Sequence, residues 1–459
     1  MRTCREHGER GAITIHVAIA LIAMLAFVSF VADYGLMWVS RRQAQNAADA
    51  GALAGAIALV HEGDNASAKR SAAQLVSENY VFGSANDATA GTGNVDIAVS
   101  GTAAGEVSLP PCGTNKGCVR VDVFRNEPDR AGTLRGAEIP TFFGKIVGVN
   151  TQGVRATATA QTANGNAIKC LLPFAVIYRW ADNTDLNKDN TYFSNDSLPG
   201  VAGWTPNDSF EPYTVVDNKG NPLGTDIYVG PYGNNPNHTG WKVGVDYGRQ
   251  LILKDGSPGQ YSAGWANEVD LPNSTGSNDY EWNIENCNPQ GVSIATEANT
   301  CPAVDWTVGC VSIKTGVSQG PTSQGIGTFT RGLVSQDAPA HWNPTYTGVG
   351  PNGLSGAVVN GSGGLDMSSP RIRPIVIIDI NNYISRGCSG STCIAKVANI
   401  IGFFVEGMCK DVTLDQGMGC DDPNKDVVGR IVTLPGSLAT GAGTVDDSAS
   451  FIKVVRLVR

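Results

Sequence analysis

The clearest arrangement of metal-binding residue types lies in the stretch 185–196. Asp185, Asn187 and Asp189 place oxygen-bearing side chains at positions one, three and five of a loop, and Asp196 stands at position twelve. An EF-hand-like loop begins to surround Ca²⁺ in this way, although position twelve is normally a Glu that binds through both oxygens. A solvated loop of Asx turns explains the same residues. The sequence leaves Ca²⁺ as a candidate ligand here, and we expect no other cofactor.

Residue types that carry catalysis are sparse. The chain has five histidines, of which only His238 and His341 lie in its distal part. The sequence contains no His-Glu-x-x-His motif for zinc, no Gly-x-Ser-x-Gly nucleophile elbow and no glycine loop with Lys for phosphate. A Ser/His/Asp triad built on His238 or His341 stays open, because its members can be distant in sequence. We predict that the protein is not an enzyme.

The cysteines predict disulfide chemistry. Cys4 lies before an apolar segment and the other ten of the eleven lie after it. An even number on one side indicates disulfides in an oxidising compartment, and unpaired buried thiols are the alternative. We expect three short clips, which are Cys112 with Cys118, Cys388 with Cys393, and Cys409 with Cys420. Pairing is open among the remaining four, which are Cys170, Cys287, Cys301 and Cys310.

Composition and charge exclude one class of partner. Lys+Arg number 33 against 42 Asp+Glu, for a net charge of −9, and the chain has no basic run that would neutralise phosphates. We therefore expect no nucleic-acid partner. A charged fraction of 16% and 56 glycines are typical of a loop-rich chain that leans towards β structure. With 459 residues, the chain is long enough for two or three domains.

The most prominent predicted element is an apolar segment at residues 12–32. It is 21 residues long and is interrupted only by Thr14, His16 and Ser29. As a helix it would span about 30 Å, which is the thickness of the hydrocarbon core. A cleavable signal peptide has a shorter apolar region that ends in a small-x-small site, whereas this segment ends in bulky Phe and Val residues. We predict a retained transmembrane helix; processing of the N-terminus is left open.

The flanking charges favour one orientation slightly. More arginines precede the segment than follow it, with Arg2, Arg5 and Arg10 against Arg41 and Arg42. The uneven cysteine distribution and the long downstream region favour the same orientation. We predict a single-pass protein of the inner (cytoplasmic) membrane, with residues 1–11 as a cytoplasmic tail and the rest extracytoplasmic. His16 is interpreted as a neutral imidazole that faces a neighbouring helix.

The helix is expected to continue past the membrane. Residues 33–60 contain no Pro and are rich in Ala, Leu, Gln and Arg, which are good helix formers. Ala47, Gly51 and Gly55 recur every four residues, and such a stripe of small residues lets another helix approach closely. Packing against the chain's own extracytoplasmic part and helix-mediated self-association are both open.

Several motifs of this region occur together in one order. They are Glu9-Arg10-Gly11-Ala12 before the apolar run, Asp33-Tyr34-Gly35 at its exit, Arg-Arg-Gln-Ala-Gln-Asn-Ala-Ala-Asp-Ala at 41–50, and Leu-Ala-Gly-Ala at 53–56. Together they resemble the N-terminal domain of TadE/TadG-like proteins of the tight-adherence (Flp, type IVb) pilus assembly systems. Pro-Thr-Phe-Phe-Gly at 140–144 and the alternating segment 154–160 look like the end of the first extracytoplasmic unit of these proteins. Residues 320–325, 337–342 and 374–379 look like the distal region of larger TadG-like members.

Two departures limit what the resemblance implies. TadE-type pseudopilins carry a Glu five residues after a processed Gly; counted from Gly11, this place holds His16. Prepilin cleavage and polymerisation are therefore not carried over. Some large TadG-like proteins have a von Willebrand A domain with an Asp-x-Ser-x-Ser metal loop. This chain reads Asp-Ile-Asn-Asn-Tyr at 379–383, so that metal site is not carried over either.

The remaining patterns predict an α+β protein. Asp64 is a candidate cap for a helix from Ala66 to about Glu78, and alternation at 95–99 and 119–124 indicates half-buried strands. We expect a pilin-like α+β unit over residues 33–165, in which two helices pack against a curled antiparallel sheet. Residues 166–459 are expected to be a mainly antiparallel, disulfide-containing β region. Its clearest strands are predicted at 375–380, 397–406, 427–434 and 452–458.

These patterns favour a structural role in the cell envelope. We expect a non-catalytic, membrane-anchored extracytoplasmic component of Tad/Flp-like pilus assembly or surface adhesion. Its partners would be the membrane and other envelope or pilus-assembly proteins. The alternative is an anchored adhesin or binding module that recognises a surface ligand, with or without dependence on Ca²⁺.

Overall fold

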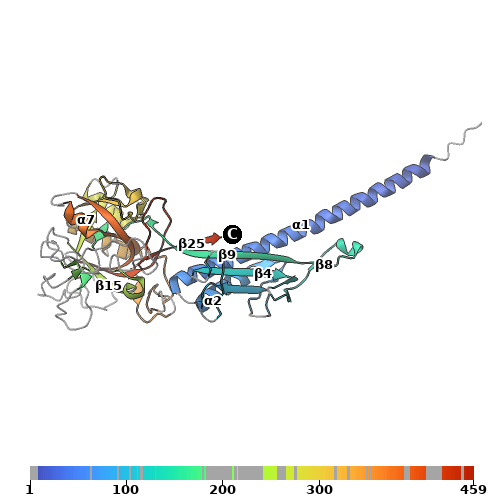
Figure 1. Cartoon of the computed structure of the whole chain (residues 1–459), viewed down its shortest axis with the longest axis horizontal. Helices are drawn as coiled ribbons and strands as arrows, with labels where there is room; N and C mark the ends of the chain where they lie inside the picture. Colours follow the sequence, from blue (N-terminus) through green and yellow to red (C-terminus); the bar gives the residue numbers. More distant parts are fainter. Residues whose placement is uncertain are drawn as a thin grey trace, which may run out of the picture. The chain divides into compact units, whose positions relative to one another are not determined.

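The computed structural model describes most of the chain, in two compact units (Figure 1). Unit 1 comprises Met1–Leu59, Asn65–Gln161 and Val455–Arg459, and unit 2 comprises Val60–Asp64 and Thr162–Val454. The described residues are 9–62, 65–89, 92–102, 105–110, 112–113, 117–129, 131–177, 180–181, 209–210, 214–215, 241–255, 265–272, 276–314, 318–327, 331–347, 350, 354–386, 393–409, 426–445 and 449–458.

Unit 1 is built on two helices and a sheet. The helices are α1 (Glu9–Glu62) and α2 (Asn65–Ser77), with a 3-10 turn η1 (Gly144–Val147). The long strands are β3 (Val95–Val99), β4 (Cys118–Arg125), β9 (Val154–Asn164) and β25 (Ile452–Val458). The short ones pair as hairpins: β1 (Tyr80–Val81) with β2 (Ser84–Ala85), β5 (Glu127–Pro128) with β6 (Leu134–Arg135), and β7 (Ile139–Pro140) with β8 (Thr151–Gln152).

Helix α1 is continuous through the apolar segment and on into unit 1. It is the one helix, among the described residues, that is long and apolar enough to cross a membrane. The large apolar side chains from Ile13 to Val31 are 51–68% exposed and lie on all sides of the helix. An apolar surface of this kind is stable only where something other than water covers it.

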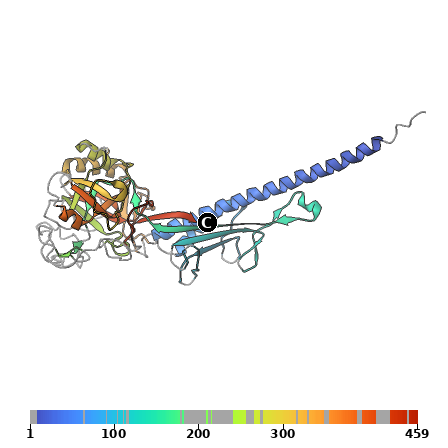
Figure 2. The same cartoon turned by 45° about the horizontal axis from the view of Figure 1, so that its top comes forward.

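The sheet of unit 1 places its long strands in the order β25-β9-β4-β3. Both β4 pairings are antiparallel, with Val121 opposite Ile97 of β3 and Ala158 of β9. The alternation of 154–160 puts four side chains into the core, because successive strand residues point to opposite faces. These are Val154, Ala156, Ala158 and Ala160. Helices α1 and α2 cover this face, as Figure 2 shows.

The opposite face of the same sheet carries a charged cluster. Buried Asp122 of β4 meets Arg120 at 2.9 Å and Arg155 at 3.2 Å, and the hydroxyl of Thr157 donates to it. Burial by itself would raise the pKa of Asp122, but these hydrogen bonds and charges hold it below its ordinary value. The cluster therefore ties adjacent strands together on the face that the helices leave uncovered.

Unit 2 contains the remaining elements. Its helices are α3 (Val243–Asp246), α4 (Ser277–Glu285), α5 (Gln319–Ile326), α6 (Leu333–Gln336) and α7 (Ile380–Ser385), with a 3-10 turn η2 (Trp306–Val308). Its main strands are β11 (Phe174–Val176), β15 (Gln250–Asp255), β16 (Trp265–Val269), β18 (Cys310–Lys314), β21 (Ile372–Ile378), β22 (Cys393–Cys409) and β23 (Asp426–Val432). Its short strands are β10 (Ala167–Ile168), β12 (Trp180–Ala181), β13 (Ser209–Phe210), β14 (Thr214–Val215), β17 (Val292–Ser293), β19 (His341–Asn343), β20 (Ala357–Val359) and β24 (Leu434–Pro435).

The main sheet of unit 2 closes on itself. Its order is β11-β21-β22-β18-β16-β15-β23, and the additional pairings β11–β16 and β22–β23 join strands from distant places in that order. Most pairs are antiparallel, whereas β11–β21 and β15–β16 are parallel. All seven residues of β21 are buried. Burial on both faces explains why 374–378 is a continuous apolar run rather than an alternating one.

Two buried arginines and a buried glutamate are hydrogen-bonded in the interior of unit 2. Arg430 donates to Glu406 at 2.8 Å, and Gln250 donates to the other carboxylate oxygen at 2.6 Å. Arg371 donates to main-chain carbonyl oxygens, including that of Val405 at 2.9 Å. Burial lowers the pKa of Arg371 to about 10, so the guanidinium stays charged at neutral pH. These hydrogen bonds compensate the buried charges of Arg430, Glu406 and Arg371.

The predicted fold class is confirmed: a long apolar N-terminal helix is followed by mostly antiparallel sheets, with helices and strands mixed. Several predicted elements also lie where the sequence places them, for example the strand 95–99 and the helix after Asp64. The strand predicted at 375–380 ends earlier, at Ile378. Asp379 accepts the backbone N–H of Asn382 at 3.0 Å and so starts α7 instead.

Candidate functional site

The best-defined polar site of unit 1 begins at Asp33, the first residue after the apolar segment. Asp33 is 8% exposed although its neighbours Ala32 and Tyr34 are exposed. It lies on the stripe of α1 that faces the rest of unit 1, and this stripe continues through Ser40 and Ala44. Because residues seven and eleven apart share one side of a helix, the carboxylate of Asp33 points towards the hairpin of β7 and β8.

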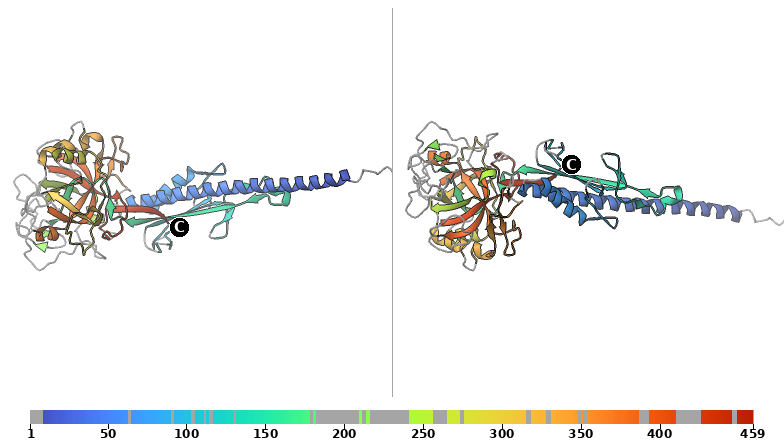
Figure 3. Two further views of the ribbon diagram at one scale, coloured as in Figure 1. Left: turned by 90° about the horizontal axis from the view of Figure 1, so that it is seen from above. Right: turned by 90° about the horizontal axis from the view of Figure 1, so that it is seen from below.

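The carboxylate of Asp33 binds three consecutive backbone N–H groups of that hairpin. One oxygen accepts from Phe142 at 2.8 Å, and the other accepts from Phe143 at 3.1 Å and Gly144 at 2.7 Å. These N–H groups converge at the start of η1, where the backbone forms a concave anion site. In all views of Figure 3 the hairpin with β8 lies beside α1. We call Asp33 and residues 141–150 the junction.

The junction keeps Asp33 ionised. Burial by itself would raise the pKa of Asp33, but the hydrogen bonds from Phe142, Gly144 and Phe143 outweigh it and lower the pKa. Charge-assisted hydrogen bonds of this kind are stronger than neutral ones. The loop is also closed on itself, since Val149 donates to Gly144 at 2.9 Å and Thr141 to Asn150 at 3.1 Å. Asp33 therefore holds a preformed loop against the helix, which is a positioning role rather than a catalytic one.

The small-residue stripe of α1 packs within unit 1. Ala47 is fully buried, and a Cβ added to Gly51 would lie 2.2 Å from Val76 of α2. At Gly55 an added Cβ would lie 2.8 Å from a side-chain carbon of Val119 in β4. Of the two alternatives that the sequence left open, this arrangement is packing against the chain's own extracytoplasmic part. Self-association through these three residues would have to displace α2 and the sheet.

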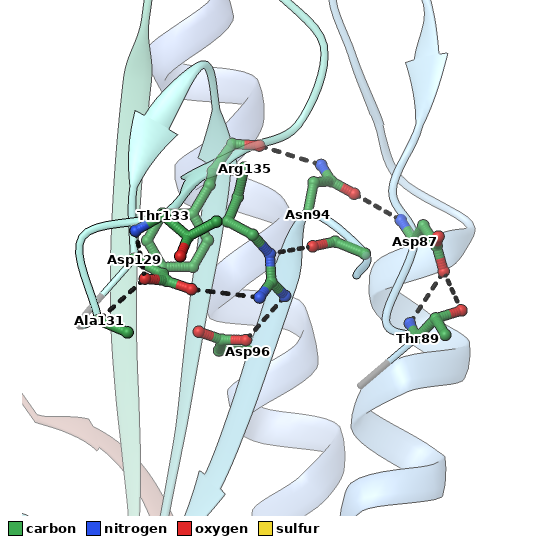
Figure 4. Close-up of polar contacts among 10 residues, drawn as sticks. Asp87, Thr89, Asn94, Asp96, Asp129, Ala131, Thr133 and Arg135 are labelled. Atoms are coloured by element: carbon green, nitrogen blue, oxygen red, sulfur yellow. Dashed lines mark hydrogen bonds and ion pairs between the residues drawn. The ribbon is translucent and has the colours of Figure 1, made fainter. Parts of the chain in front are cut away.

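A second polar cluster surrounds Arg135 (Figure 4). Its guanidinium contacts Asp96 at 3.1 Å and Asp129 at 3.3 Å. Asp129 accepts the backbone N–H groups of Thr133 and Ala131, and these bonds outweigh its burial and lower its pKa. Figure 4 shows the carboxylate of Asp129 joined by hydrogen bonds to Thr133, Ala131 and Arg135. The cluster therefore clips the β5–β6 hairpin to β3, and its carboxylates are engaged by the protein itself.

The disulfides of the structure follow the cysteine pattern of the sequence. Cys112 is joined to Cys118, as expected for the first clip. Among the four cysteines whose pairing the sequence left open, Cys170 is joined to Cys287 and Cys301 to Cys310. Cys393 is also disulfide-bonded, but its expected partner Cys388 lies outside the described residues. The side chains of Cys409 and Cys420 lie outside them as well.

The candidate metal and catalytic residues can be followed only in part. Asp185, Asn187, Asp189 and Asp196 all lie outside the described residues, so the Ca²⁺ loop stays a prediction, as does the binding module built on it. In the described ranges no group of three or more His, Cys, Asp or Glu side chains could hold a metal ion. His238 lies outside the described residues too, and Nδ1 of His341 lies 3.1 Å from the carbonyl oxygen of Pro339 in its own turn.

Asp33 and Phe142–Gly144 belong to separate sequence motifs, and no local pattern connects the two. A single acidic residue at the end of an apolar span was the available signal, because such a group needs partners once the helix is covered. Nothing in the local pattern of Arg135 marked it as a cluster centre. Both sites depend on contacts between residues about forty or more positions apart.

Two family models match the amino-terminal third of the chain. Residues 11–58 match the model described as "Putative Flp pilus-assembly TadE/G-like", and residues 44–160 match "Putative Tad-like Flp pilus-assembly". No curated protein and no solved structure matches the chain. The TadE/TadG-like assignment made from the sequence motifs is therefore confirmed for these residues, and the matches indicate a role in Flp/Tad pilus assembly.

Proposed function

We propose that this TadE/TadG-like chain is a single-pass component of the cell envelope that takes part in assembling an Flp/Tad pilus. Residues 12–32 would cross the cytoplasmic membrane, with the N-terminus inside and the rest of both compact units, from residue 33 onward, outside. One observation carries the proposal: α1 runs without a break from an apolar stretch exposed on all sides into the core of the Tad-like unit. A bilayer is the solvent that suits the first part of this helix.

The continuous helix explains how such a component would work. Between Asp33 and Glu62, α1 has 29 further residues, which correspond to about 44 Å of helix. Small residues seat this part of the helix directly on α2 and β4. The membrane-spanning part of α1 and the sheet of unit 1 would therefore move together. This design suits a protein that presents a surface to other pilus-assembly proteins at a set place beside the membrane.

The disulfides support the extracytoplasmic side. Cys112–Cys118 lies in unit 1, whereas Cys170–Cys287 and Cys301–Cys310 lie in unit 2. Disulfides persist in oxidising compartments and are rare in the cytosol. All six of these cysteines follow the apolar helix. They reach an oxidising compartment if the chain after the helix is exported.

Deletion and complementation of the gene test the pilus role. Cells that lack the chain should lose surface pili, as counted by electron microscopy, and the full chain should restore them. A variant with residues 12–32 replaced by a cleavable signal peptide should fail to restore pili, since its units would be released. The matched control replaces 12–32 with an unrelated apolar span and should succeed. Normal piliation without the chain would contradict the proposal.

Thiol labelling tests the orientation. In intact spheroplasts, a membrane-impermeant maleimide should label no cysteine without reductant, because Cys4 would be cytoplasmic and the others oxidised. Lysis without reductant should then expose Cys4 alone, and a Cys4→Ser variant provides the control. Free labelling of the later cysteines in lysed cells would contradict the extracytoplasmic placement.

A further inference from the structure

The loop of the junction carries an unusual set of exposed side chains. Phe142 and Ile146 are 66% and 80% exposed, and Phe143 and Val149 are exposed as well. Four large apolar side chains within eight residues of a hairpin tip are not expected on a water-facing turn, where polar residues dominate. The backbone of this loop is hydrogen-bonded to Asp33 and within itself, so its apolar side chains project from an ordered support.

Asp33 determines the position of this loop along the axis of α1. Its carboxylate follows the apolar segment immediately, and it holds Phe142 to Gly144 at hydrogen-bond distance. The loop tip therefore lies beside the point where the exposed apolar segment of α1 ends and the part that packs against the rest of unit 1 begins. If residues 12–32 span a bilayer, this place is the boundary between hydrocarbon and headgroups.

The neighbouring residues of α1 are of the types that suit this boundary. Tyr34 and Trp38 are both exposed, and the guanidinium of Arg42 lies 4.6 Å from the centre of the Trp38 ring. Aromatic side chains are enriched at the membrane–water interface. Lys145, in the middle of the loop, is exposed and long enough to reach headgroup phosphates while its stem stays on apolar surface.

We infer that residues 141–150 form a second membrane contact, with Phe142, Phe143, Ile146 and Val149 seated in the interface of the outer leaflet. The occupant of this apolar surface is a phospholipid bilayer, because Asp33 holds the loop beside the end of the exposed apolar segment of α1. The inference rests on the proposed anchoring of α1. Unit 1 would then be held by the helix and by the loop, with Asp33 joining the two. Two contacts restrict the tilt of unit 1 more than a helix alone.

Photo-crosslinking of the full chain in nanodiscs tests this contact. The photoreactive amino acid benzoyl-phenylalanine replaces Ile146 in protein reconstituted with phosphatidylethanolamine and phosphatidylglycerol, and lipid adducts are measured by mass spectrometry. The same replacement at Phe27, inside the apolar segment, measures whether that segment contacts lipid. Val107 is the control in the same unit: it is exposed, and it pairs at the end of the sheet where Val119 meets Gly55. Gly55 lies 22 residues beyond Asp33, about 33 Å along the helix.

The expected result is lipid adducts at positions 27 and 146, several-fold above those at position 107. An Asp33→Ala change should lower the adducts at 146 several-fold and leave those at 27 unchanged, because it removes the acceptor that holds the loop. Adducts at 27 with none at 146 would overturn the loop contact while the anchor stands. Crosslinks from 146 to protein instead of lipid would assign the surface to a protein partner and also overturn it. Absence of adducts at 27 would overturn the anchoring itself.

Discussion

The two halves of α1 are both apolar, but the first half has large side chains and the second half has small ones. Residues 13–31 are rich in Ile, Leu, Val and Phe, and their large side chains are exposed in every direction. Residues 44–59 are rich in Ala and Gly, and one stripe is buried against α2 and the sheet. Among the described residues, no protein buries the first half, whereas the second half has no room even for an added Cβ at Gly51 and Gly55.

This difference shows what each half is made to contact. A bilayer surrounds a helix, so it favours bulky apolar residues on all sides. A protein partner approaches from one side, and small residues bring the two backbones close together. Asp33 stands at the change between these environments, where its charge is compensated by three N–H groups of the junction.

The largest effect is expected from a charge in the first half. Ile22→Lys places an ammonium group near the middle of the apolar segment, which costs about 2.5–3.5 kcal/mol in membrane insertion. The same change at Ile57, which is exposed on the second half, should cost less than about 0.5 kcal/mol. The fraction of each variant that resists carbonate extraction measures this. Equal losses at the two positions would remove the distinction between the halves.

A smaller effect is expected from added volume in the second half. Gly51→Leu drives a side chain into Val76, where even a Cβ would be 2.2 Å away. Overpacking of this kind destabilises unit 1 by about 1–3 kcal/mol. Gly35→Leu is the control, because nothing lies within 4 Å of its added Cβ, and helix propensity favours the change by about 1 kcal/mol or less. Pulse proteolysis of the full chain in detergent compares the two. A stable Gly51→Leu protein would mean that the helix does not pack as described.

The smallest effect is expected at the boundary, and it depends on pH. The pKa of Asp33 is lowered in the folded protein, so its contribution to stability is complete above the ordinary value of 3.8 and is lost as the pH falls through the lower folded value. Asp33→Asn turns an amide NH₂ or a neutral oxygen towards the N–H groups of Phe142 and Gly144. The melting temperature of unit 1 should therefore fall by a constant amount between about pH 5 and 8. Below about pH 4 the difference from the unchanged protein should shrink. A difference that widens as the pH falls would contradict this role.

Local patterns predicted much of unit 1. Alternation identified β3 and the buried face of β9, since a period of two leaves a clear mark in the sequence. The apolar run and the absence of Pro identified α1. The motifs at both ends of the junction were also visible, although their contact was not. Asp33 and Gly144 are separated by 111 residues, and no local rule connects two such positions.

Unit 2 was less accessible to sequence reasoning. The strands 372–378 and 426–432 lie near the places where alternating or apolar runs indicated them. The closure of the sheet through β11–β16 and β22–β23 was not predicted, because strand pairing depends on distant partners. The last strand, β25, was predicted from its pattern, but not its place beside β9 in the sheet of unit 1. The return of a chain end to an earlier domain leaves no periodic signal.

Protease protection shows whether the first half of α1 spans the membrane and the second half carries the two units on the outer side. The full chain carries one epitope tag at each end, and protease is added to intact and to lysed spheroplasts. We expect the C-terminal tag to be lost from intact spheroplasts while the N-terminal tag survives until lysis. Survival of the C-terminal tag in intact spheroplasts, together with its loss on lysis, would rule out this topology.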